Sequence, residues 1–382
     1  MTTAVLPEVG TDEEPTGGPG SGSGSGSGPS SIGEVSQWRL MSRRFTASRL
    51  AVASVIVLAI LYLCAIFATF LAPNPYDQQD SDQKYAAPSA LTWDGGPAIC
   101  SKTQYLDKAR FEYKYRTDCS KGVPIHIFGR GFEYKLFGLI PTDRHLMTVA
   151  PPNKLLLWGA DSQGRDVFAR AMQGARVSLT IGLFGVAVGT FLGATIGTVS
   201  GFFGGAIDNI LQRFIELLLS LPTLPLWLAL AAILPQNMSV TDRYFLITLI
   251  LSLVGWAGLA RQVRGKVLGY SSSEYVAAAR AAGSKNSRII FTHLLPNATS
   301  HIVVTAMLAV PATIIAETSL SFLGVGMLPP AVSWGVLLSD AQSVSTVQQY
   351  PWLLIPAALV VLAVICFQLI GDGLRDAVDP YS

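Results

Sequence analysis

The sequence predicts an all-α membrane protein with six transmembrane helices and a small extracytoplasmic domain inserted after the first of them. Three observations support this fold class. Half of the 382 residues are hydrophobic and only 14% are charged, whereas a soluble domain usually carries about a quarter charged residues. Six long apolar stretches alternate with polar segments. Basic residues collect in every second connection, as they do in proteins that cross a bilayer.

The first segment, residues 1–37, is acidic and then alternates glycine with serine. A segment without an apolar period cannot bury enough surface to offset its chain entropy, so we expect a disordered tail. It also lacks the basic and apolar regions that a signal peptide has near its start. Residues 38–72 then form a cytoplasmic lead-in and the first transmembrane helix.

The six apolar stretches are candidates to cross a hydrocarbon core of about 30 Å as helices. We expect these spans at residues 50–72, 177–207, 211–234, 245–260, 302–323 and 351–371. In the second stretch glycine recurs every three or four residues, which brings neighbouring helices close together in a membrane. In the third, Pro222 and Pro225 break the helix locally, and they are candidates for a pathway or gate.

The distribution of basic residues sets the orientation. Four arginines precede the first stretch, six basic residues lie between the fourth and fifth, and the short loops on the other side hold almost none. The positive-inside rule therefore places both termini in the cytoplasm, and six spans satisfy this parity.

The long polar insertion at residues 73–170 would then lie outside the cell. The run Pro124 to Ile140 indicates one or two short strands with glycine turns. Cys100 and Cys119 fall in this insertion, where they could form a disulfide in an oxidising compartment or remain free thiols. The cysteines and histidines show no metal-binding spacing.

The connection at residues 263–297 is the most informative segment. Ala277 to Ala282 favours a helix, and Gly283 can end it with a positive φ. A second helical piece, Lys285 to Leu295, is expected to follow and to end at Pro296. Two short basic helices held outside the membrane are typical of a docking element rather than a catalytic site.

This segment resembles the coupling loop of binding-protein-dependent ABC importer permeases. The resemblance lies in Ala277-Ala278-Ala279, followed by Gly283 and later by Leu295-Pro296. Ala277 and His293 stand where the family often has a glutamate and an apolar residue, so salt-bridge roles do not carry over to them. Residues 159–179, 317–338 and 371–380 are similar to segments of dipeptide and oligopeptide permeases. The resemblance covers about residues 40–90 and 157–382.

The resemblance identifies the peptide/nickel subgroup and, within it, the second permease subunit, here with an enlarged external loop. It implies a type I ABC importer permease fold, with a core of five helices in residues 171–382, and half of a translocation pathway for peptides. The implied partners are a homologous permease, two ATP-binding subunits, an extracytoplasmic substrate-binding protein and the lipid bilayer of the bacterial cytoplasmic membrane, and no nucleic acid. The implied ATPase-coupling residues are Ala277, Ala278, Ala279, Arg280, Gly283, Leu295 and Pro296.

The chain has no nucleotide-binding loop, so we expect ATP and Mg to bind to partner ATPases. We expect no cofactor, metal site or catalytic residue in this chain. The sequence leaves three rival functions: an importer of nickel or another small ligand, a membrane-anchored enzyme with an external catalytic domain, and a secondary transporter driven by an ion gradient. The last would leave the basic connection at residues 263–297 without a purpose. The absence of intramembrane histidine or cysteine clusters speaks against a metal pathway.

Two glutamates near span ends are further candidates, because ionised groups within a membrane are costly. We interpret Glu216 as an interfacial residue. For Glu317 a pathway or gating role and an interfacial role are equally compatible with the sequence. Asp161, Arg165 and Asp166 have no nucleophile or histidine nearby, so we expect a polar turn and helix cap rather than acid–base chemistry.

Overall fold

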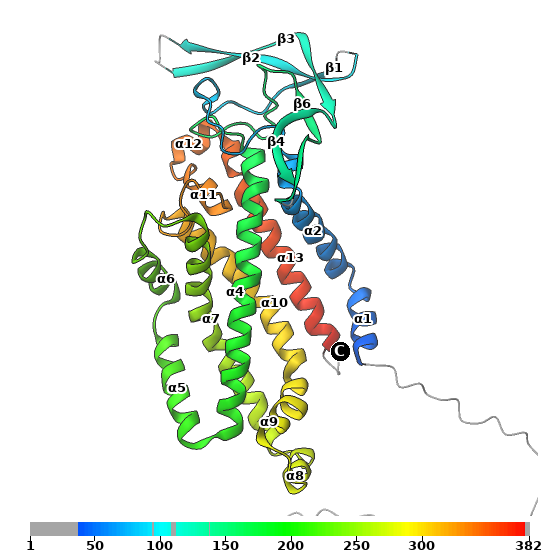
Figure 1. Cartoon of the computed structure of the whole chain (residues 1–382), viewed down its shortest axis with the longest axis vertical. Coiled ribbons are helices and arrows are strands. Elements are labelled where there is room, and N and C mark those ends of the chain that lie inside the picture. The colour runs from blue at the N-terminus through cyan, green and yellow to red at the C-terminus, as the bar shows by residue number, and fades with distance from the viewer. Residues whose placement is uncertain (1–36, 94, 108–111, 137, 379–382) are drawn as a thin grey trace, which may run out of the picture.

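The computed structural model describes residues 37–93, 95–107, 112–136 and 138–378. The chain is mostly helical, with long helices running between a strand-rich end and the end that carries the short helices α8 (Glu274–Ala281) and α9 (Asn286–Arg288) (Figure 1). The tail predicted at residues 1–37 lies outside the described residues except for Gln37, where α1 (Gln37–Ala47) begins.

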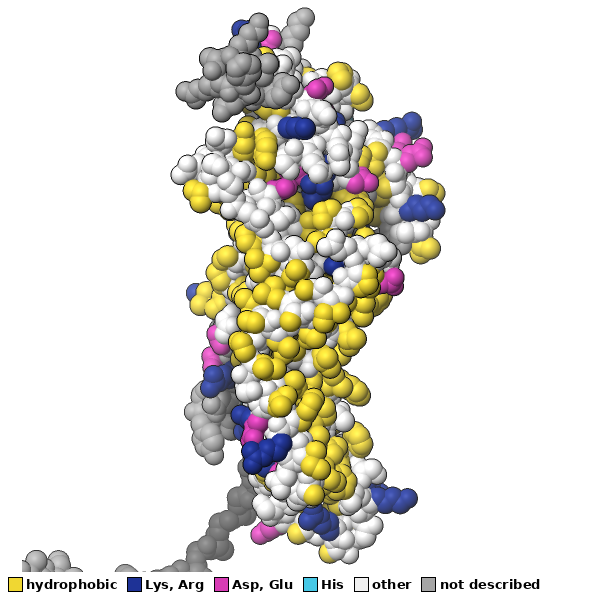
Figure 2. Space-filling model, turned by 90° about the vertical axis from the view of Figure 1, so that its left-hand side faces the viewer, with side chains coloured by type: hydrophobic (Ala, Val, Ile, Leu, Met, Phe, Trp, Pro, Cys, Tyr) yellow, Lys and Arg dark blue, Asp and Glu magenta, His cyan; other side chains and the backbone are white. Residues whose placement is uncertain are grey.

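Five helical segments of the described chain are long and apolar enough to cross a membrane, judged by length and composition. A sixth is added if α5 (Gly205–Ser220) and α6 (Thr223–Ala232), which bend by 87° at their junction, form one span. The five are α2 (Arg49–Ile66), α4 (Val167–Phe203), α7 (Val240–Ser271), residues Asn286–Phe322, and residues Pro351–Val378. On the face that Figure 2 shows, apolar side chains dominate the middle of the molecule, and most of the charged ones lie towards its two ends or at one edge.

The predicted spans are each present as helix, but their boundaries differ. The helix α4 begins ten residues before the predicted start at residue 177, because Asp166 caps it ahead of the apolar stretch. The helix α7 extends the predicted span at both ends, into polar sequence. The first span is completed by the short α3 (Ala68–Leu71). Apolar periodicity locates the part of a helix in lipid, and polar turns that continue the helix carry no such signal.

The third predicted span is broken where the prolines indicated. Pro222 is the N-cap residue of α6, and Pro225 follows in the first turn. Backbone N–H groups in the first turn of a helix have no intrahelical partner, so a proline there loses no hydrogen bond.

The glycines of α4 form its contact with α7 and α10 (Leu295–Phe322). A Cβ on Gly193 or Gly201 would lie 2.8 or 2.9 Å from a backbone carbonyl of α7, and one on Gly197 would clash with the carbonyl of Ala260. At Gly182 the neighbour is Ile314 of α10, at 2.7 Å. The prediction that this glycine repeat brings helices into close contact is therefore confirmed.

The described residues of the insertion form six strands. The expectation of one or two strands in the run Pro124 to Ile140 is confirmed, since this run holds the end of one strand and all of the next, and Gly138 turns after them with a positive φ. Four strands pair antiparallel in the order β1-β2-β3-β6, and β4 pairs with β5. Their bounds are Leu91–Trp93, Pro97–Asp107, Glu112–Ile127, Arg130–Leu136, Ile140–Arg144 and Met147–Val149 for β1 to β6. Much of the ribbon formed by β2 and β3 is exposed and polar, so it lacks the alternation that identifies a half-buried strand. A disulfide joins Cys100 to Cys119 across this ribbon.

The main apolar core lies between α2, α4, α10 and α13 (Ile355–Val378). The short helix α11 (Trp334–Ser339) closes it at the strand-rich end, where Trp334 is fully buried and its Nε1 donates to the carbonyl of Ala171 at 3.0 Å. The helix α12 (Val344–Gln349) and the turn Pro351–Leu354 connect α11 to α13.

Candidate functional site

The segment between α7 and α10 (Leu295–Phe322) bends sharply at Gly283, and we call residues 272–294 the elbow. The helix α8 (Glu274–Ala281) ends in a Schellman motif: the N–H of Ser284 donates to the carbonyl of Ala279, and that of Gly283 donates to Arg280. The φ angle of Gly283 is +75°, which glycine adopts without the strain that a Cβ causes. The local sequence therefore fixes the bend.

Apolar contacts hold the elbow against the ends of α7 and α10. Val276 of α8 is fully buried, as are Ile289 and Leu294 on the return segment. These side chains form one cluster with Val263 and Val267 of α7. The elbow is thus fixed to both helices at the end of the molecule opposite the strands (Figure 1).

Small residues are exposed on the outer surface of the elbow, beside larger side chains such as Tyr275 and Phe291. Ala277 and Ala278 are exposed, Ala279 is half-buried, and Gly283 has open space around it. Such a surface lets another protein approach the backbone of α8 closely. The guanidinium of Arg280 instead lies over the ring of Phe202 in α4, 5.3 Å from its centroid, which is within the range of a cation–π contact.

The second helical piece does not end at Pro296, so that expectation was wrong. After α9 (Asn286–Arg288), a π-helical turn, Ile289–Leu294, leads directly into α10. Pro296 lies in the first turn of α10, and Leu295 is its first residue. A π turn already departs from the regular hydrogen-bond pattern, so it accommodates a nearby proline without a break in the helix.

A hollow of about 1390 Å³ lies between α4, α7 and α10, with contributions from α1 and α13. Its wall combines glycines and apolar side chains with hydroxyl and amide side chains. These include Gly189, Gly255, Gly258, Thr190, Ser252, Gln262, Asn297, Ser300, Thr305 and Thr313. Neutral donors and acceptors on a glycine-rich wall can bind a polar solute of variable shape. The sequence analysis did not identify this site.

The candidate gating prolines do not line this hollow. Pro222 and Pro225 are exposed, at the junction of α5 and α6. Glu216 is also exposed and pairs with Arg213 at 3.0 Å. This geometry agrees with the interfacial interpretation of Glu216.

Glu317 is fully buried and is not at a lipid interface. Its carboxylate accepts hydrogen bonds from the hydroxyls of Ser178 in α4, at 2.9 Å, and Ser321 in α10, at 2.8 Å. The Ser178 hydroxyl in turn accepts from the backbone N–H of Trp334 in α11. Glu317 therefore connects three helices at the strand-rich end of the core, and the structure places it outside the lining of the hollow.

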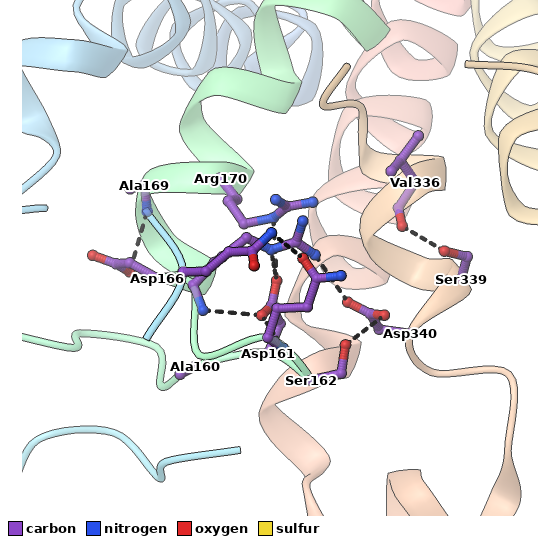
Figure 3. A network of polar contacts seen from close by, with 12 residues as sticks. Ala160, Asp161, Ser162, Asp166, Ala169, Arg170, Val336, Ser339 and Asp340 are labelled. Carbon is purple, nitrogen blue, oxygen red and sulfur yellow. Dashed lines mark hydrogen bonds and ion pairs between the residues drawn. The ribbon is translucent and has the colours of Figure 1, made fainter. Parts of the chain in front are cut away.

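A second cluster of buried charge, which we call the outer joint, lies at the start of α4 (Figure 3). The carboxylate of Asp161 pairs with Arg165 at 2.7 Å, and Arg170 Nε lies 3.4 Å from it, too poorly directed for a hydrogen bond. Asp340, beyond α11, accepts from Ser162 at 3.1 Å and lies 3.8 Å from Arg165. Burial raises the pKa of Asp340 above its ordinary value.

The expected polar turn and cap are present beside this joint. Asp161 accepts from the backbone N–H groups of Gln163 and Arg165, which closes the turn. Asp166 caps α4 by accepting from two backbone N–H groups and also accepts from Asn74 at 2.9 Å. Burial raises the pKa of Asp166 to about 6.

Two protein-family models match the chain, one on each side of the insertion that contains the strands. Residues 175–381 match the family described as binding-protein-dependent transport system inner membrane component. This match covers more than half of the chain. The chain belongs to this family. Residues 36–88 match the N-terminal transmembrane domain of oligopeptide transport permease C.

Individual relatives are also permeases. The chain is 38% identical over 250 residues to the oligopeptide transport system permease protein OppC of Bacillus subtilis, covering 65% of this chain and 77% of the relative. It is 40% identical over 241 residues to the protein of that name from Haemophilus influenzae, covering 63% and 75%. It is 40% identical over 232 residues to the dipeptide transport system permease protein DppC of Bacillus subtilis, covering 60% and 70%. This protein is thus a multi-pass membrane protein of a transport permease family.

Proposed function

We propose that this chain is one of two permease subunits of an ATP-driven, binding-protein-dependent importer that takes up peptides. Family membership and the named functions of the relatives support the reaction and the peptide cargo. The hollow supports the same cargo, because its hydroxyl and amide groups suit a peptide backbone. The second permease subunit would be homologous and would complete the pathway.

The proposed topology has six spans, with α5 and α6 together counted as one. The α1 helix, the elbow and the end of α13 would lie in the cytoplasm, and the strands would form a small domain outside. The exposed Arg261, Lys285 and Arg288 at the elbow end support this orientation through the positive-inside rule. A cysteine-free chain with single reporter cysteines in the elbow and in β3 would test it with a membrane-impermeant thiol reagent.

The elbow carries the proposal. A rigid, bent element with an exposed small-residue surface, packed on α7 and α10, can transmit movement from another subunit to the helices around the hollow. Two partner ATPases, which would bind ATP and Mg, would receive the elbow and move it as a rigid body when they close around ATP. An extracytoplasmic binding protein would deliver peptide to the opposite end.

The test replaces the residue that fixes the bend. A leucine at Gly283 would be strained by about 1–2 kcal/mol at this positive φ. This strain is too small to unfold a stable chain. We expect Gly283→Leu to abolish ATP-dependent peptide uptake while membrane insertion is unchanged. Gly283→Asn should retain uptake, because asparagine tolerates this conformation.

The matched control is Gly269→Leu, which adds the same bulk at an exposed glycine of α7 with open space around it. Uptake should survive this change. A correctly inserted Gly283→Leu protein that transports like the wild type would refute the coupling role of the elbow. Parallel uptake assays with labelled peptides and with Ni²⁺ separate the peptide importer from its nickel-transporting rival.

A further inference from the structure

The hollow carries positive charge at one end. Lys266 of α7, Arg44 of α1 and Arg375 of α13 line it there, and the imidazole of His301 in α10 is also part of the lining. Among the described residues that line the hollow, none is aspartate or glutamate. Lys266 and His301 adjoin the elbow in sequence, so this is the end through which cargo would leave in the proposed function.

Topology alone does not explain this placement. The positive-inside rule requires cations near the cytoplasmic ends of helices, but not cations that face a pathway. Arg261, five residues before Lys266 on α7, is exposed and lies outside the lining of the hollow. The two cations share a helix, yet only Lys266 lines the hollow.

The rest of the wall is uncharged. It mixes apolar side chains, such as Leu251, Val304 and Leu308, with hydroxyls, amides and glycines that can contact any peptide backbone. Gly255 and Gly258 add no side chain, and a Cβ on either would meet no neighbour within 4 Å. Charge at the elbow end is therefore the feature of this wall that distinguishes peptides by the sign of their net charge.

We propose that Lys266, with His301 beside it, makes the exit of the hollow a charge filter that favours anionic peptides over cationic ones. The inference rests on the proposed function, since it takes peptides as the cargo. Fixed charges in a cleft with low-dielectric walls raise the local concentration of ions of opposite sign. A C-terminal carboxylate or acidic side chains would be attracted to this exit, and peptides rich in lysine or arginine would be slowed there.

The experiment uses the complete transporter, with its partner subunits and binding protein, reconstituted in liposomes. ATP-driven uptake is measured for three peptides of equal length: one rich in glutamate, one neutral and one rich in lysine. The ratio of acidic to basic peptide uptake is compared between the wild type, Lys266→Glu and the matched control Arg261→Glu. Comparison of ratios cancels the preference of the binding protein, which is the same in all three.

We expect Lys266→Glu to lower the acidic-to-basic uptake ratio about five- to tenfold, which corresponds to a change of about 1–1.4 kcal/mol in the difference between the two peptides. Lys266→Gln should shift it in the same direction by a smaller factor, and Arg261→Glu should leave it unchanged. A ratio unchanged in Lys266→Glu, or shifted equally by Arg261→Glu, would overturn the filter while leaving peptide import intact. A wild-type transporter that hydrolyses ATP but imports none of the three peptides would overturn the proposed function itself.

Discussion

The two ends of the helical bundle are stabilised in different ways. At the outer joint, buried charges from segments far apart in sequence meet, with Asp161 and Arg170 before and within α4 and Asp340 beyond α11. At the elbow, one continuous segment folds on itself and on the adjoining turns of α7 and α10 through apolar contacts. Damage to the first should spread through the fold, and damage to the second should stay local.

The largest expected effect is at the outer joint. Asp161→Ala removes the carboxylate nearest to Arg170, whose side chain is 3% exposed, and leaves that charge buried. Breaking a buried ion pair in this way costs about 3–5 kcal/mol of folding free energy. Thermal unfolding of the purified chain in detergent should show a large loss of stability.

The control for this change is a pair at the surface. Glu216→Gln breaks the exposed contact with Arg213 and should change the stability by less than about 1 kcal/mol. Equal stability of the two variants would mean that the outer joint does not hold the fold together.

The next largest effect is expected at the contact between α4 and α7, the two long helices that run from the outer joint to the elbow. Gly197→Ala places a methyl against the backbone of Ala260, so α4 and α7 must separate, at a cost of about 1–3 kcal/mol. The control, Gly265→Ala on α7, meets no neighbour within 4 Å and should stabilise the helix by up to about 1 kcal/mol. Thermal unfolding of both variants, side by side, measures the difference. Equal behaviour of the two would show that close helix contact is unimportant here.

Local features of this fold could be predicted from the sequence. The apolar stretches located the helices, because a helix that crosses lipid needs about 20 predominantly apolar residues in a row. The glycine repeat of α4, the bend at Gly283 and the proline break between α5 and α6 also follow from local chemistry. Each depends on residues within a few turns of one another.

Features that depend on distant residues could not be predicted. The lining of the hollow comes from five helices, and the partners of Glu317 lie on α4 and α10. The role of Asp340 could not be predicted from the residues next to it in sequence, because its contacts with Ser162 and Arg165 form only when α11 packs against the start of α4. The wrong end assigned to the elbow at Pro296 has a related cause: a proline ends a helix by default, and only the π turn before it removes the conflict.

The smallest expected effect tests whether the elbow is locally stabilised. Val276→Ala leaves a cavity beside Ile289 and Leu294, and all three side chains are fully buried. The change should cost about 1–2 kcal/mol of stability. Because this cluster lies at the tip of α7 and α10, we expect faster hydrogen exchange in residues 274–294, reduced uptake, and little change in the unfolding of the remaining helices. Ala281→Ser, on the exposed side of α8, should leave exchange in the Val276 cluster unchanged. If Val276→Ala instead destabilised the whole chain as much as Asp161→Ala, the elbow would be part of the global fold, and a rigid-body movement transmitted through it would have no separate unit to act on.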